Sequence, residues 1–121
     1  MAVILIVEDD VFIRQLAELM ILDWGHHILS ACDVPEALIH LRSSHQIDVL
    51  FTDVRLKAEK HGGCDVAREA ISLRPGLRVL YTTAIRGTDK LHALFAAGTR
   101  FLPKPYTEDQ LGLSVQSLLA V

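Results

Sequence analysis

Residues 2–10 read AVILIVEDD. The first six form a continuous, largely β-branched apolar run, which is typical of a strand covered on both faces. The run ends in three acids, so this strand carries negative charge to one end of its sheet. A second strongly apolar run, DVLFT at 48–52, is followed by another acid, Asp53. The two runs predict the central strands of a sheet with charged groups at one edge.

Short apolar runs alternate with longer amphipathic ones along the whole chain. We predict strands at 2–7, 27–31, 48–52, 77–83 and 100–102, and helices at 11–24, 34–43, 65–73, 88–98 and 107–120. Five such units predict an α/β fold, with a five-stranded parallel sheet and helices on both faces. Right-handed crossovers and central placement of the most apolar strands favour the flavodoxin-like order 2-1-3-4-5.

Local signals support the predicted helix ends. Gly25 ends the first helix, in which apolar residues at 12, 16, 19 and 20 have helical spacing. Asp33 is the expected N-cap of the second helix, with Pro35 in its first turn. Thr107 is the expected N-cap of the last helix.

Composition limits the class of protein. The chain has 121 residues, of which 50% are apolar and 22% charged, as in a soluble globular protein, and we expect a single domain over 1–121. The net charge is -3 and the basic residues are scattered, so we expect no nucleic-acid partner for this domain. No apolar run approaches the roughly 20 residues that span a bilayer. We expect a cytoplasmic protein without membrane contact.

Several polar residues follow the predicted strands directly. Glu8 and Asp9 follow the first strand, Asp53 the third, Thr83 ends the fourth, and Lys104 follows the fifth. Each has an ordinary explanation by itself, such as a helix cap or a surface charge. In a flavodoxin-like sheet, however, all of them meet at the carboxyl edge, where ligands bind between strands 1 and 3. The coincidence predicts a functional site.

The chemistry of such a site is specific. Clustered carboxylates repel one another, and oxygen ligands without histidine or cysteine favour Mg²⁺. A carboxylate held beside the ion can attack phosphorus and become an aspartyl phosphate. The transferring group carries charge on three oxygens, which Mg²⁺, Lys104 and the Thr83 hydroxyl can stabilise.

The same residues give the chain a resemblance to the receiver domains of two-component response regulators. The resemblance covers essentially the whole chain and depends on four motifs in order at strand ends. They are ILIVEDD (4–10), VLFTDVRL (49–56), VLYTTA (79–84) and FLPKPY (101–106).

The resemblance implies a phosphoacceptor that works with Mg²⁺. Asp53 would accept the phosphoryl group from a histidine kinase or a histidine phosphotransfer protein. Asp9, Asp53 and the backbone carbonyl of Arg55 would bind Mg²⁺, and Glu8 would assist through water. The domain would take part in its own phosphorylation and dephosphorylation without being an enzyme for an external substrate.

It also implies a switch. Thr83 would be the switch hydroxyl, Phe101 the aromatic residue that turns, and the bond between Lys104 and Pro105 would be cis. The switched face would consist of helix 4 (88–98), strand 5 and helix 5, and would contact a downstream protein or a second copy of the chain.

Two other interpretations remain open at this point. A phosphatase of the haloacid dehalogenase type also uses aspartate, Mg²⁺ and lysine, but requires a D-x-D pattern after strand 1, where this chain has Glu8 and Asp10. A pseudo-receiver would keep the fold and bind a partner without phosphorylation. The chain could stand alone or form part of a larger kinase or regulator.

Overall fold

A computed structural model describes residues 1–56, 62–83 and 99–120, except for the side chains of Cys64 and Thr83. Its five strands form one sheet in the order β2-β1-β3-β4-β5, and every neighbouring pair is parallel. The predicted sheet order is therefore confirmed. The strands are β1 (Val3–Val7), β2 (His27–Ala31), β3 (Val49–Asp53), β4 (Arg78–Thr83) and β5 (Arg100–Pro103).

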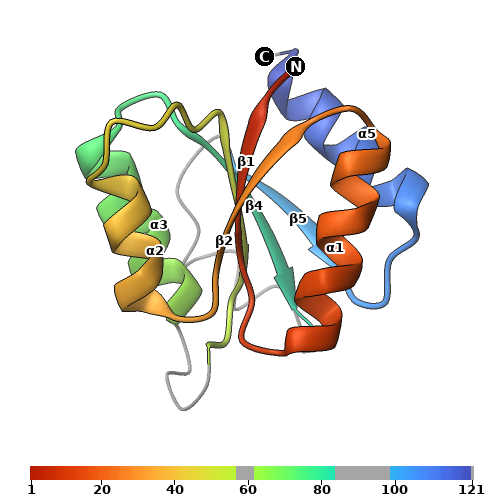
Figure 1. Cartoon of the computed structure of the whole chain (residues 1–121), viewed down its shortest axis with the longest axis horizontal. Helices are drawn as coiled ribbons and strands as arrows, with labels where there is room; N and C mark the ends of the chain where they lie inside the picture. The colour runs from red at the N-terminus through yellow and green to blue at the C-terminus, as the bar shows by residue number, and fades with distance from the viewer. Residues whose placement is uncertain (57–61, 84–98, 121) are drawn as a thin grey trace.

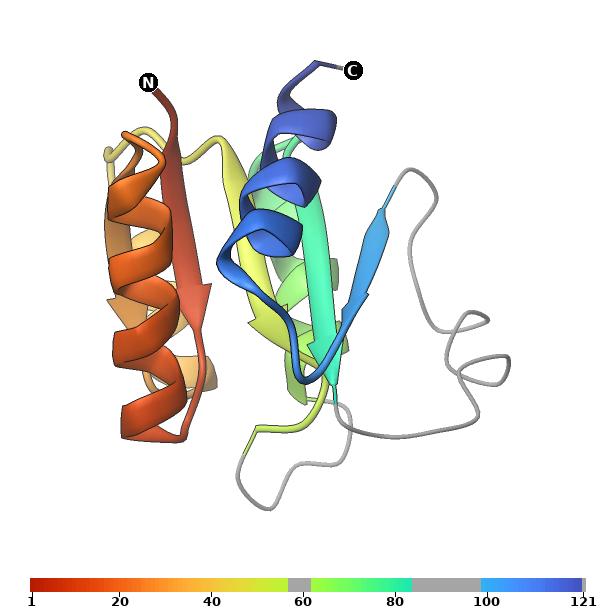
Figure 2. The same ribbon diagram turned by 90° about the vertical axis from the view of Figure 1, so that its right-hand side faces the viewer.

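Helices cover both faces of the sheet, as predicted (Figure 1). One face carries α1 (Val11–Asp23) and α5 (Glu108–Leu119), and the other carries α2 (Val34–Leu41) and α3 (Gly62–Leu73). The view in Figure 2 shows α1 and α5 in front of the strands. The helix predicted for 88–98 lies outside the described residues. Each described helix is too short or too polar to cross a bilayer.

The hydrophobic core has two parts, one on each side of the sheet. Side chains along each strand alternate between the two faces. In β3, Phe51 therefore packs toward α1 and α5, while Leu50 packs toward α2 and α3. All five residues of β3 are buried, so Asp53 ends a strand that is fixed on both faces.

Hydrogen-bonding caps fix the helix ends close to the predicted positions. The Asp10 side chain accepts from the backbone N–H groups of Phe12 and Ile13 at the start of α1. Asp33 caps α2, and Thr107 forms a capping box with Gln110 at the start of α5. Caps of this kind contribute about 1 kcal/mol each.

The first helix exposes most of the apolar residues whose spacing predicted it. The apolar positions that predicted it include Phe12, Leu16 and Leu19, which are 80%, 54% and 63% exposed. Its buried residues are Ala17 and Ile21 instead. The helix is apolar on two sides, and one of them faces away from the core.

The third helix begins at Gly62, three residues before the predicted start at Asp65. Gly62 and Gly63, which the prediction left outside this helix, belong to its first turn. The helix can begin there because Gly63, without a side chain, fits directly against the main chain at the end of β3.

Candidate functional site

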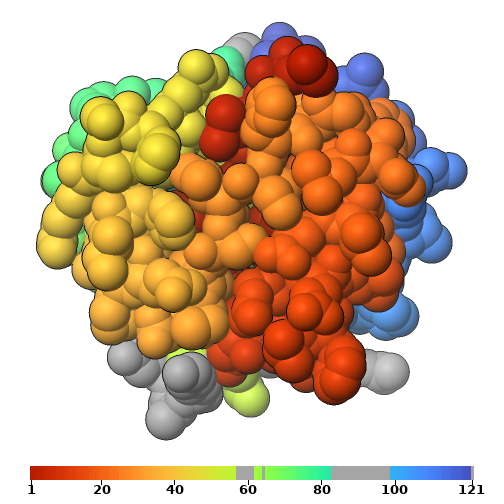
Figure 3. Space-filling model, in the orientation of Figure 1, coloured from red at the N-terminus to blue at the C-terminus, as the bar shows by residue number. Residues whose placement is uncertain are grey.

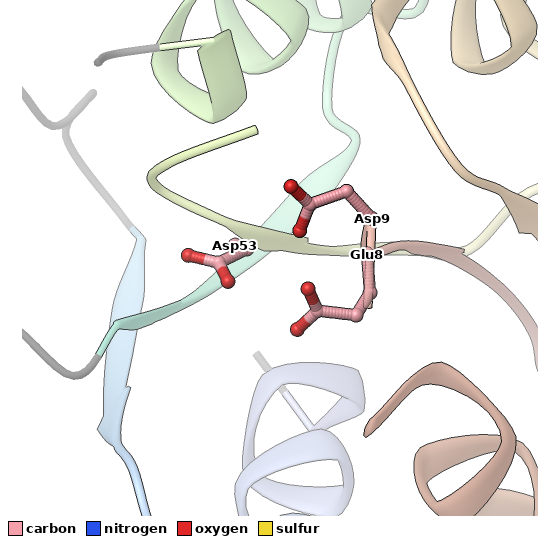
Figure 4. Close-up of side chains that lie close together, drawn as sticks. All are labelled: Glu8, Asp9 and Asp53. Atoms are coloured by element: carbon pink, nitrogen blue, oxygen red, sulfur yellow. The ribbon is translucent and has the colours of Figure 1, made fainter. Parts of the chain in front are cut away.

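Three carboxylates meet at the carboxyl edge of the sheet. Glu8 and Asp9 follow β1, and Asp53 ends β3, the next strand in the sheet. One carboxylate oxygen from each lies within 4.8 Å of the others, and Figure 4 shows the three side chains gathered at one point. Glu8 and Asp53 are buried, with 4% and 8% of their surface exposed. Buried acids at this spacing need positive charge nearby.

Lys104 supplies that charge. Its Nζ donates to Asp53 Oδ2 at 2.6 Å and to Glu8 Oε1 at 2.8 Å. The Lys104–Pro105 peptide is cis, as the resemblance implied. The lysine follows β5, whereas Glu8 follows β1 and Asp53 ends β3, so the lysine side chain reaches past the end of β4. The sequence placed these groups at one edge, and the structure brings them into direct contact.

Backbone groups hold the carboxylates in place. Asp53 Oδ1 accepts from the N–H of Arg55 at 3.0 Å, and Glu8 Oε2 accepts from the N–H of Asp10 at 3.2 Å. The Arg14 guanidinium donates to the Glu8 carbonyl at 3.0 Å. Both oxygens of Asp53 therefore have donors before any ligand arrives.

The site shifts the pKa of three side chains. Burial raises the pKa of Glu8 from 4.5 to about 7, with the Lys104 hydrogen bond opposing this effect and the Asp53 charge adding to it. Burial alone would lower the pKa of Lys104, but its hydrogen bonds to Asp53 and Glu8 raise it overall. Burial also raises the pKa of Tyr106 to about 12. The site thus stabilises a charged lysine and disfavours full ionisation of its acids.

Gly63 lies directly against the backbone of Asp53. A Cβ at this position would overlap the backbone carbonyl oxygen of Asp53, so only glycine lets α3 approach this closely. The Gly63 N–H also donates to the Val54 carbonyl at 3.0 Å. Sequence reasoning missed this contact, although the Gly-Gly pair at 62–63 was a visible signal.

The other predicted site residues occupy the same end of the sheet. Thr83 ends β4 opposite Pro103 of β5, but its side chain lies outside the description. Phe101 is half-buried against the α2 and α3 side of the core. Arg55 is exposed, and its N–H contacts Asp53. The roles assigned to these residues stay predictions.

The acidic cluster fits a hard divalent cation. Its donors are three carboxylates, and within the described ranges it is the one group of three or more acids, histidines or cysteines placed to share an ion. Oxygen donors of this kind suit Mg²⁺ better than zinc or copper. The donor chemistry agrees with the predicted cofactor without identifying the ion.

An apolar surface that the sequence analysis did not identify lies next to this edge. It consists of Phe12, Leu16 and Leu19 of α1, and α1 lies on the surface shown in Figure 3. Beside it, a pocket of about 260 Å³ is lined by α1 and by the chain after β5. Its lining residues are Ile13, Leu16, Met20, Lys104, Pro105 and Tyr106. The pocket shares Lys104 with the acidic cluster.

Comparison with known proteins identifies the class. The family model for the response regulator receiver domain matches residues 4–116. The chain therefore belongs to this family, which acts in two-component signalling systems. The acidic cluster fits the phosphoacceptor site of such a domain.

Relatives and solved structures agree with this assignment. The chain is 29% identical to the virulence transcriptional regulatory protein PhoP of Salmonella typhimurium, covering 96% of this chain and 51% of PhoP. It is 27% identical to the probable transcriptional regulator ycf27 of Cyanidium caldarium, covering 96% of this chain and 45% of the relative. It thus spans about half the length of these relatives. A receiver domain protein from Clostridium thermocellum superimposes with a TM-score of 0.87 at 26% identity, covering 99% and 95% of the two chains.

Proposed function

We propose that this receiver domain accepts a phosphoryl group on Asp53 from a histidine kinase or a histidine phosphotransfer protein in the cytoplasm. The observation that carries the proposal is Lys104, whose Nζ joins Glu8 and Asp53 at a buried acidic edge. A lysine that donates to two acids can donate instead to a phosphoryl oxygen once the phosphoryl group arrives, and so stabilise the negative charge of that group. The domain acts stoichiometrically and turns over no external substrate.

In the transfer, a carboxylate oxygen of Asp53 bonds to phosphorus while the P–N bond of the donor histidine breaks. The imidazole nitrogen keeps the bonding electrons and takes up a proton. Lys104 must release Asp53 Oδ2, to which it now donates at 2.6 Å, and then donate to a phosphoryl oxygen. The Arg55 N–H holds Oδ1 and thereby fixes the plane of the carboxylate.

Asp9, Asp53 and the backbone carbonyl of Arg55 would bind Mg²⁺, with Glu8 assisting through water. The ion would neutralise the charge of the acids and of the incoming group. The carboxylates within 4.8 Å of one another support this part of the proposal.

The protein donor has to bring its phosphohistidine to Asp53 and must therefore cover the surface around this edge. We assign it the apolar surface of α1, because α1 begins next to Glu8 and Asp9 and exposes Phe12 in its first turn. Burying an exposed aromatic residue of this kind gives an interface much of its affinity.

We assign the surface that passes the signal on to the side of β5 and α5. This surface would contact a downstream protein or a second copy of this chain. The relatives named as transcriptional regulators are about twice as long as this chain, which is consistent with a receiver that acts through other protein segments.

Phosphorylation of the domain with acetyl phosphate and Mg²⁺ tests the proposal. Mass spectrometry should show one added phosphoryl group on the parent and none on Asp53→Asn, because an amide does not attack phosphorus. The variant Asp65→Asn, which changes an exposed acid on α3, is the control and should be labelled normally. Equal labelling of Asp53→Asn and the parent would show that the acceptor is elsewhere.

A further inference from the structure

The buried hydroxyl of Thr82 has no hydrogen-bond partner among the residues that the structure describes. The residue is 3% exposed, and in the described part of the chain its Oγ1 is the one buried side-chain oxygen or nitrogen without a hydrogen-bond partner. An unpaired buried hydroxyl costs about 1–3 kcal/mol. Because most buried polar groups in native proteins are hydrogen-bonded, an unpaired one requires an explanation.

The fold places this hydroxyl at the phosphoacceptor. Thr82 pairs in register with Asp53 on the neighbouring strand. It lies two residues after Leu80, which packs on the α1 and α5 side, so it faces the same side as Asp53. Together with Glu8, Asp53 and Tyr106 it lines a hollow too narrow to admit a water molecule. Water therefore does not supply the missing partner.

Lys104 donates to two of the acids that line this hollow. Its side chain reaches from the end of β5 past β4 to donate to Glu8 Oε1 and Asp53 Oδ2. A Lys104 side chain that leaves Asp53 Oδ2 for a phosphoryl oxygen can also give up its hydrogen bond to Glu8 Oε1, and this buried oxygen then needs another donor. The Thr82 hydroxyl lines the same hollow and can turn about χ1 between staggered positions.

We propose that Thr82 is a positioning residue of the phosphorylated state, in which its hydroxyl donates to the Glu8 carboxylate oxygen that Lys104 releases. This inference rests on the proposed function. Thr82 does not touch the reacting atoms. It stabilises the arrangement in which Lys104 serves the phosphoryl group, and so favours the phosphorylated form over the resting one.

The test compares Thr82→Val, Thr82→Ser and the parent, with and without Mg²⁺ and beryllofluoride as the probe for the phosphoryl group. Without the probe, Thr82→Val should melt at a higher temperature than the parent, because it removes an unpaired polar group. With Mg²⁺ present, it should bind beryllofluoride about tenfold more weakly, the loss expected for a hydrogen bond to a charged group. Thr82→Ser keeps the hydroxyl and should restore the affinity of the parent.

Thr52→Val is the matched control. Thr52 is equally buried on the opposite face of the sheet, and its hydroxyl already donates to the Asp53 carbonyl at 3.0 Å. Its loss should lower the melting temperature by similar amounts in both states, which is the signature of a purely structural hydroxyl.

Three results would overturn the inference. Beryllofluoride affinity in Thr82→Val equal to that of the parent would show that the hydroxyl gains no partner. A lower melting temperature of Thr82→Val without the probe would show that the hydroxyl is bonded at rest. A parent that does not respond to Mg²⁺ and beryllofluoride would contradict the proposed function and, with it, this inference.

Discussion

Replacing Glu8 by glutamine should change how the stability of the metal-free domain depends on pH. Burial raises the pKa of Glu8 from 4.5 to about 7, so between these values the folded chain holds a proton that the unfolded chain has released. The free energy of unfolding must therefore fall as pH rises through this window. The fall is complete above about pH 7 and amounts to roughly 3 kcal/mol.

Urea denaturation of the parent and of Glu8→Gln across this pH window measures the effect. Glutamine stays neutral, and its amide oxygen can still accept from Lys104, so the variant should lack the fall in stability that Glu8 causes. Taking the difference between the two proteins removes the contributions that they share, including His26, whose pKa is lowered by burial. Above pH 7 the variant should be the more stable protein.

Mg²⁺ should reduce the difference, because a bound cation favours the ionised form of Glu8. Glu69→Gln removes an exposed acid on α3 and serves as the control for the loss of one negative charge. Its stability should follow the parent at every pH. If Glu8→Gln also follows the parent, burial does not hold a proton on Glu8, and the reasoning from its surroundings is wrong.

Three further predictions concern the ion, the donor and the switch. Asp9→Ala should weaken Mg²⁺ binding at least about tenfold in a calorimetric titration, and an unchanged affinity would remove Asp9 from the ligand set. Phe12→Ala should slow transfer from a phosphohistidine protein about fivefold and leave labelling by acetyl phosphate unchanged; equal effects on both donors would argue against docking on α1. Thr83→Ala should still accept phosphate at Asp53 but show a weaker amide NMR response to beryllofluoride over residues 99–106. Shift changes as large as those of the parent would exclude the Thr83 switch.

The sheet was predictable because its signals are local. Continuous apolar runs mark β1 and β3 as central, and caps such as Asp33 and Thr107 mark helix starts through hydrogen bonds within a few residues. A parallel sheet then brings its strand ends together without further information. This is why Asp53 and Lys104 could be assigned to one edge from the sequence.

The side of a helix that packs against the core is harder to predict from the sequence than the helix itself. Helical spacing of Phe12, Leu16 and Leu19 correctly indicates a helix, but spacing alone does not say which of two apolar sides meets the core. The structure buries Ala17 and Ile21, although Phe12, Leu16 and Leu19 are also strongly apolar. Packing against the sheet makes this choice, and packing is a tertiary property.

The finer features of the site also depend on distances between elements. The sequence gives no sign that Lys104 bonds to Glu8 as well as to Asp53, or that the Thr82 hydroxyl is enclosed without a partner. Burial, which raises the pKa of Glu8, appears only when α1, β3 and the chain after β5 are in place. The types of residue that form the site could be predicted from the sequence. Their hydrogen-bond partners and pKa shifts could not.

The close approach of Gly63 to the Asp53 main chain has a mechanical consequence. Because Gly63 lies against the Asp53 carbonyl with no side chain between them, the end of β3 and the start of α3 are in direct main-chain contact. A shift of the Asp53 main chain toward α3 would therefore push directly on this helix. The helix in turn packs on α2. We therefore expect this half of the domain to move little when Asp53 is modified, so that displacement falls on the opposite side of Asp53.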